Sequence, residues 1–107
     1  MQIIQLTMND NGKVINTSSE AVLIIRLEGN PTTGYRWEVS EINHSVISNV
    51  QQNIEPGSSL AAGAGGPFVF RLSGLQTGIS KVTFKYLKPW EGDNSILQRF
   101  AITVNVS

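Results

Sequence analysis

The chain has 107 residues, of which 40% are hydrophobic and 15% are charged, and eight basic residues balance eight acidic ones. This composition excludes a disordered tail, and the lack of a basic excess argues against a nucleic-acid partner. The chain has no cysteine, which excludes a thiol nucleophile, a zinc–thiolate site and disulfides. No apolar run approaches the roughly 20 residues of a membrane helix, so we expect no membrane association.

Hydrophobic and polar residues alternate with a period of two through most of the chain, a pattern typical of half-buried strands. The pattern predicts seven strands, near residues 3–8, 20–28, 35–40, 46–50, 68–73, 81–86 and 99–106. A turn is predicted at Asn11–Gly12, between the first two strands. Seven short strands in about 100 residues favour an all-β fold, an immunoglobulin-like β-sandwich of seven to eight strands. We expect residues 1–107 to form a single domain.

Three connections are predicted to share one end of the sandwich, because successive strands reverse direction. They cover residues 29–34, 55–66 and 89–96 and together hold 26 residues. One side of a standard protein–protein interface uses about 20–30 residues, so these loops have the size of one binding surface. The turns at Asn11–Gly12, His44 and Gly74–Gly78 are expected at the opposite end.

The two tryptophans call for different interpretations. Trp37 lies in the middle of a predicted strand, on its apolar phase, and we expect it in the core. Trp90 follows a strand and stands between a proline and an acidic turn. We expect an exposed binding role for it, because tryptophan dominates interface hot spots. The alternative is that Trp90 folds back onto its own sandwich.

Catalytic and metal-binding chemistry is not predicted. The single histidine, His44, belongs to the end away from the three loops, so a hydroxyl nucleophile there would lack a base. Glu91 and Asp93 are two possible calcium ligands, whereas calcium prefers six to eight oxygens. We therefore expect no enzyme activity, no metal and no cofactor.

The loop residues have two possible interpretations on their own. The hydroxyls of Thr32 and Thr33 can both donate and accept hydrogen bonds, but a plain turn explains their surroundings equally well. Gly63, Gly65 and Gly66 would allow a partner to approach the backbone closely, or they form a loose loop.

Taken together and in order, the loops resemble the chagasin family of cysteine protease inhibitors, and within it the amoebiasin type. The resemblance covers the whole chain and rests on three segments, Asn30-Pro31-Thr32-Thr33-Gly34-Tyr35, Ala62-Gly63-Ala64-Gly65-Gly66 and Lys88-Pro89-Trp90. It implies a monomeric, tight-binding, reversible inhibitor of papain-family, cathepsin L-like proteases that occludes the active-site cleft with three loops. It also implies that all of these residues contact the protease.

The resemblance further implies a position for each loop. Thr32 and Thr33 would lie near the catalytic Cys–His pair of the protease, the glycine loop would follow the non-primed side, and Trp90 would pack on the primed-side rim. The sequence departs from the family in small ways. Lys88 replaces a frequent arginine and cannot form a bidentate fork, and Tyr35 replaces a frequent phenylalanine. The small Ala62 would fill a hydrophobic subsite less well.

Two other classes of function are alternatives to an inhibitor. One is a non-inhibitory module that binds protein or carbohydrate through the same loops, using Trp90 with Asp93 and Asn94. The other is an enzyme, which the missing base at the loop end disfavours. The cellular location has two alternatives. We expect a cytoplasmic protein if the chain is the full-length product, and an endolysosomal, vesicular or secreted protein if a signal peptide was trimmed.

Overall fold

The structure is a computed structural model that describes residues 2–29, 33–54 and 68–107. Two short 3-10 helices, η1 (Met8–Asp10) and η4 (Gly92–Ser95), occur in this part of the chain. The described strands are β1 (Gln2–Leu6), β2 (Val14–Thr17), β3 (Ala21–Leu27), β4 (Arg36–Glu41), β5 (Ile47–Ile54), β6 (Phe68–Leu75), β7 (Gly78–Leu87) and β8 (Gln98–Val106).

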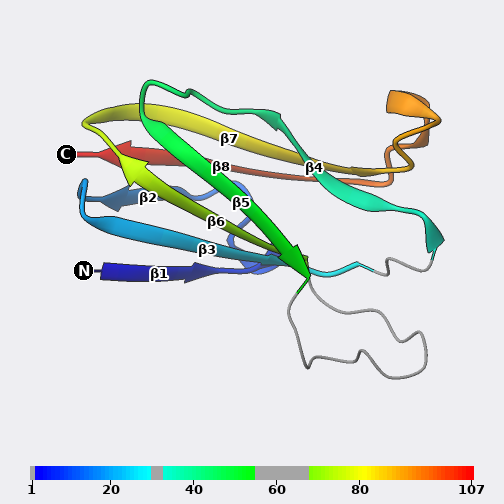
Figure 1. The fold of residues 1–107 in the computed structure, drawn as a ribbon, viewed down its shortest axis with the longest axis horizontal. Coiled ribbons are helices and arrows are strands. Elements are labelled where there is room, and N and C mark those ends of the chain that lie inside the picture. Colours follow the sequence, from blue (N-terminus) through cyan, green and yellow to red (C-terminus); the bar gives the residue numbers. More distant parts are fainter. Residues whose placement is uncertain (1, 30–32, 55–67) are drawn as a thin grey trace.

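The strands form two four-stranded sheets that face each other as a sandwich (Figure 1). One sheet has the order β1-β3-β6-β5 and the other the order β2-β8-β7-β4. Neighbouring strands are antiparallel except in two pairs, β1 with β3 and β2 with β8. The all-β, immunoglobulin-like sandwich predicted from the alternation is confirmed.

The start of the chain differs from the prediction, because β2, a strand that the alternation did not predict, follows the turn at Asn11–Gly12. β1 ends at Leu6, the chain turns through η1, and β2 joins the opposite sheet. The turn is closed by a capping box, in which Thr7 and Asp10 bond each other's backbone, and by Gly12 at a φ of +86°. A four-residue strand shows too few alternations to be recognised, and β2 is half exposed at Val14 and Ile15.

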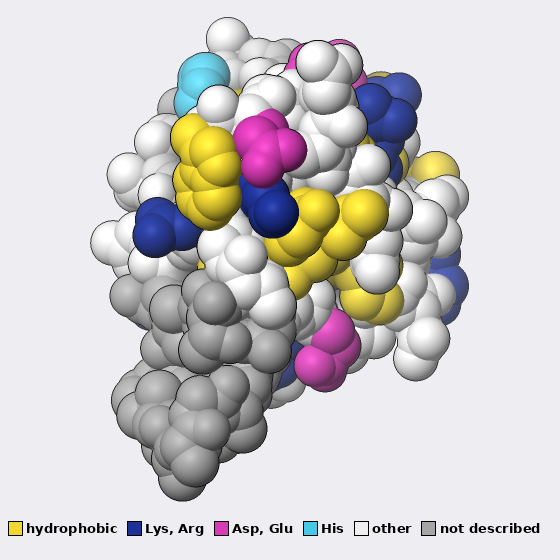
Figure 2. All heavy atoms as spheres, turned by 90° about the vertical axis from the view of Figure 1, so that its right-hand side faces the viewer, with side chains coloured by type: hydrophobic (Ala, Val, Ile, Leu, Met, Phe, Trp, Pro, Cys, Tyr) yellow, Lys and Arg dark blue, Asp and Glu magenta, His cyan; other side chains and the backbone are white. Residues whose placement is uncertain are grey.

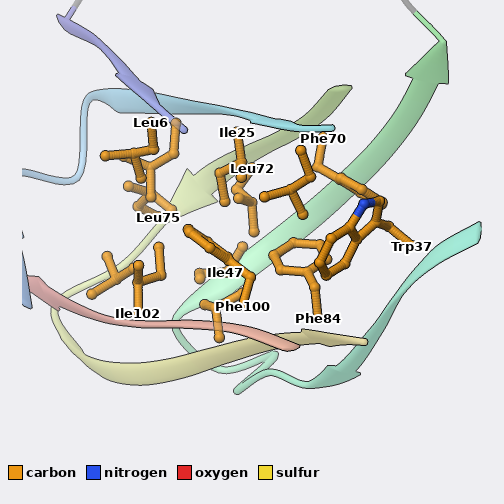
Figure 3. Close-up of a cluster of buried hydrophobic side chains, with 14 of the residues drawn as sticks. Leu6, Ile25, Trp37, Ile47, Phe70, Leu72, Leu75, Phe84, Phe100 and Ile102 are labelled. Carbon is orange, nitrogen blue, oxygen red and sulfur yellow. The ribbon is translucent and has the colours of Figure 1, made fainter. Parts of the chain in front are cut away.

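The core consists of the inward-facing side chains of both sheets. Ile25, Phe70 and Leu72 from one sheet meet Phe84 and Phe100 from the other (Figure 3). Each of these five side chains is essentially inaccessible to solvent. Burial of an aliphatic or aromatic side chain stabilises the fold by roughly 1.5–3 kcal/mol, so this cluster fixes the two sheets relative to each other.

Trp37 lies in this core, as predicted, at the end nearest to the start of β4 (Figure 3). Its indole nitrogen donates a hydrogen bond of 2.9 Å to the backbone oxygen of Glu28. The buried N–H is therefore satisfied, and the same bond anchors the chain just after β3. Among the described residues no helix has the length and apolar character needed to span a bilayer.

Candidate functional site

Three connections leave strand ends that lie toward one end of the sandwich, on the right in Figure 1. They are the β3–β4, β5–β6 and β7–β8 connections, because Leu27 and Ile54 both pair with Phe68 while Arg36 pairs with Leu87. This agrees with the end predicted from strand reversal. Viewed from this end, hydrophobic side chains lie exposed among acidic and basic ones (Figure 2).

The opposite end holds the turns around His44 and Gly74–Gly78, as predicted. The backbone N–H of Gln76 donates to the oxygen of Val46 at 2.8 Å, which brings the two turns together. The expectation for Asn11–Gly12 was wrong. This turn lies alongside β8, where the Gly12 N–H donates to Ala101, because the chain changes sheets there instead of reversing at the far end.

The structure describes only part of the predicted binding set. Thr33, Gly34, Tyr35, Lys88, Pro89 and Trp90 are described and lie at the loop end. The remaining predicted residues lie outside the described ranges, namely Asn30, Pro31, Thr32, Ala62, Gly63, Ala64, Gly65 and Gly66.

Trp90 is exposed, with 69% of its surface accessible to solvent. It does not fold back into the core, but the outer edge of its indole rests on the neighbouring loop at Gly34. A Cβ atom placed on Gly34 would lie 2.5 Å from Cη2 of Trp90 and 3.3 Å from Cζ2. Gly34 has a φ of +88°, a conformation that favours glycine. The two loops therefore meet through an indole edge and a bare backbone.

A column of packed side chains lies between the loops and the core, and it consists of Trp37, Tyr86, Tyr35 and Lys88. Trp37 packs against Tyr86 with ring centroids 5.0 Å apart, and Tyr86 stacks on Tyr35 at 5.3 Å. The ammonium of Lys88 lies 5.2 Å from the centre of the Tyr35 ring. Aromatic and cation–π contacts of this kind each contribute about 0.5–1.5 kcal/mol. The column joins the β3–β4 and β7–β8 connections to the core.

The turn after β7 is closed by the hydroxyl of Ser95. Its oxygen accepts a 2.9 Å hydrogen bond from the N–H of Lys88 and lies 2.8 Å from the backbone oxygen of Gly92, to which it donates. The N–H of Glu91 also donates to the oxygen of Lys88 at 2.9 Å. Residues 88–95 are thus held as a compact turn with Trp90 at its tip.

Two ion pairs flank this turn. Lys85 binds the Asp93 carboxylate at 2.8 Å, and Lys88 lies 3.7 Å from the Glu91 carboxylate. The hydrogen bond from Lys85, and then its charge, hold the pKa of Asp93 below its usual value. Both pairs are solvent-exposed, so each stabilises the fold only weakly and mainly orients the turn.

The described part of the loop end offers shape and exposed surface rather than reactive groups. His44 is exposed at the opposite end, and no cluster of three or more metal-ligating side chains occurs among the described residues. The Asp93 carboxylate binds Lys85, and the Glu91 carboxylate lies near Lys88.

Sequence reasoning missed two supporting residues, Tyr86 and Ser95. Tyr86 carried a usable signal, since it lies on the apolar phase of its strand, but its stacking on Tyr35 depends on the pairing of β4 with β7. Ser95 carried no signal, because a serine in a polar turn is ordinary and its bonds depend on how the turn closes.

Comparison with known proteins agrees with this geometry. The family model described as chagasin family peptidase inhibitor I42 matches residues 16–104. Amoebiasin-1 of Entamoeba histolytica is 33% identical over 103 residues, which cover 94% of this chain and 97% of that protein.

Two solved structures share the fold over the whole chain. One is the cysteine protease inhibitor EhICP2 from Entamoeba histolytica, with a TM-score of 0.83, 23% identity and 97% of that chain covered. The other is PbICP-C in complex with falcipain-2, with a TM-score of 0.62, 20% identity and 100% of that chain covered.

Proposed function

The chain belongs to the chagasin family of peptidase inhibitors, and from this premise we propose that it inhibits papain-like cysteine proteases through the three connections at one end of its sandwich. It acts as a binding protein and not as an enzyme. Inhibition requires a rigid wedge that fills the open cleft of the protease and shields its thiolate–imidazolium pair.

The exposed, supported Trp90 is the observation that carries this proposal. Its indole is 69% accessible, yet the turn beneath it is closed by Ser95 and is linked to the core through Lys88 and Tyr35. A large aromatic side chain on a rigid support binds a partner with little loss of conformational freedom. These are the properties of an interface hot spot, which is enriched in tryptophan.

On the basis of the family resemblance, we propose a place in the protease cleft for each connection. In this proposal Asn30, Pro31, Thr32 and Thr33 lie near the catalytic Cys–His pair. The segment Ala62-Gly63-Ala64-Gly65-Gly66 follows the non-primed side of the cleft. Lys88, Pro89 and Trp90 contact the primed-side rim, and Gly34 and Tyr35 belong to the same protease-binding surface.

A carbohydrate-binding module is less well supported. Such a module would use Trp90 with Asp93 and Asn94, but the Asp93 carboxylate is already bound by Lys85. A sugar platform also gains from several exposed aromatic rings, and Trp90 is the one strongly exposed aromatic side chain in the described part of the loop end.

The proposal is tested by titrating papain and a cathepsin L-like protease with this chain, using a small fluorogenic substrate. We expect complete and reversible loss of activity at one inhibitor per active site, and no effect on a serine protease. Full activity of both cysteine proteases at micromolar concentrations of the chain would overturn the proposal and favour a non-inhibitory binding module.

A further inference from the structure

The contact between Gly34 and Trp90 joins two loops that are 56 residues apart in the sequence. The edge of the indole that faces Gly34 consists of Cζ2, Cη2 and Cζ3, which lie 3.3, 2.5 and 3.4 Å from the position of a Cβ atom. Any side chain at position 34 would occupy the space that this edge fills. Glycine is therefore favoured at position 34 for two reasons, its φ of +88° and the indole edge beside it.

The contact holds the outer edge of the indole, while most of the Trp90 surface stays accessible to solvent. Without a neighbour, an exposed tryptophan would sample several rotamers, and binding would have to order it. Ordering one flexible side chain in an interface costs free energy and so weakens binding. A side chain held in place before binding avoids that cost.

We infer that Gly34 is a positioning residue: its bare backbone forms the seat that orients Trp90, so that the two loops meet the protease as one preformed surface. This inference rests on the proposed function. Gly34 acts through Trp90 here, and the inference needs no direct contact between Gly34 and the enzyme.

The test uses Gly34→Ala with Gly12→Ala as a matched control. Gly12 has nearly the same φ, +86°, but a Cβ there meets nothing within 4 Å and the residue lies beside β8. Both variants therefore carry the strain of alanine in the left-handed region. Only Gly34→Ala also collides with the indole, whose exposed end can move away without unfolding the chain.

The first readout is the indole N–H signal of Trp90 in the nuclear magnetic resonance spectrum of the free protein. We expect Gly34→Ala to shift this signal and to raise the quenching of tryptophan fluorescence by acrylamide, while Gly12→Ala changes neither. The indole signal of Trp37, hydrogen-bonded to Glu28, serves as an internal reference for an intact core.

The second readout is a double-mutant cycle measured as papain inhibition. We expect Gly34→Ala to raise the inhibition constant on the order of 3- to 10-fold in the natural chain. In a Trp90→Ala background the same change should have little further effect, because the side chain that it disturbs is gone.

The inference is overturned if the Trp90 signal is unchanged in Gly34→Ala. It is also overturned if the losses of binding free energy caused by Gly34→Ala and Trp90→Ala simply add. Its failure can be told apart from a failure of the proposed function. An unaltered chain that does not inhibit papain would overturn the proposed function. The position of the Trp90 signal in the free protein shows separately whether Gly34 contacts the indole.

Discussion

At the scale of single residues, Trp90 shows what the sequence can and cannot predict. Its exposure followed from its place after a strand, between a proline and an acidic turn. Its contact with Gly34 could not be foreseen, since it depends on how two distant loops close over the same strand ends. The burial of Trp37 was predictable, because alternation alone assigns a residue to one face of a strand.

We predict that Trp90→Ala weakens protease binding by about 2 kcal/mol or more, the range of an interface hot spot. The melting temperature should change little, because the side chain is mostly exposed. Inhibition constants and thermal melts measure the two effects separately.

His44→Ala is the control for this substitution, since it removes an exposed aromatic ring at the opposite end of the sandwich. It should leave inhibition unchanged. A large loss with His44→Ala, or none with Trp90→Ala, would show that the binding surface has been placed at the wrong end.

At the scale of elements, the turn between β7 and β8 depends on one hydroxyl. We predict that Ser95→Ala lowers the free energy of unfolding by about 1 kcal/mol, the typical value of a lost hydrogen bond. It should also raise the inhibition constant, because the turn that carries Trp90 becomes looser. Chemical denaturation and inhibition assays measure the two effects.

Ser48→Ala is the matched control for the turn. The Ser48 hydroxyl donates a 3.0 Å hydrogen bond to the oxygen of Gly74, at the end away from the loops. This variant should lose some stability and keep full inhibition. Equal losses of inhibition in both serine variants would mean that global stability, and not the closure of the turn, controls binding.

Two acidic residues make the stability of the turns depend on pH. Bonds from the Thr7 backbone and from Lys13 lower the pKa of Asp10 in η1, and Lys85 lowers the pKa of Asp93 in η4. An aspartate whose pKa is lower in the folded chain stabilises the fold above its unfolded pKa of about 4. That stabilisation is lost as the pH falls through the folded pKa.

We therefore predict that the melting temperature falls as the pH drops below about 4, and that the fall is smaller in Asp10→Asn and Asp93→Asn. Thermal melts over pH 2–6 measure the slope of the melting temperature against pH. Asp93 is exposed and Asp10 is only partly buried, so the differences should be small and should shrink in high salt. A slope that neither variant reduces would contradict the assignment of these ion pairs.

At the scale of the whole molecule, the period-two pattern was enough to predict the fold class, because both sheets are buried on one face only. It failed where the chain changes sheets at η1, since β2 is too short to show a period. The loop end was predictable from strand reversal. Its supports were not, because the column of Trp37, Tyr86, Tyr35 and Lys88 depends on register between strands.

For the proposed function, the architecture would allow a chain of this size to bind a protease tightly without covalent chemistry. A nanomolar dissociation constant corresponds to a binding free energy of about 12 kcal/mol. This value is reached only if little free energy is lost in ordering the interface. The closed turn at Ser95, the seat at Gly34 and the aromatic column hold the described part of the loop end in place before binding.

The central claim is that the loop end occupies the protease cleft, and a competition measurement tests it most directly. Binding of the chain is measured by interferometry to free papain and to papain whose cleft is filled by a peptide-like inhibitor bonded to the catalytic cysteine. The account predicts tight binding to the free enzyme and none to the filled enzyme at micromolar concentrations. Equal affinity for both forms would contradict it, because the chain would then be bound outside the cleft.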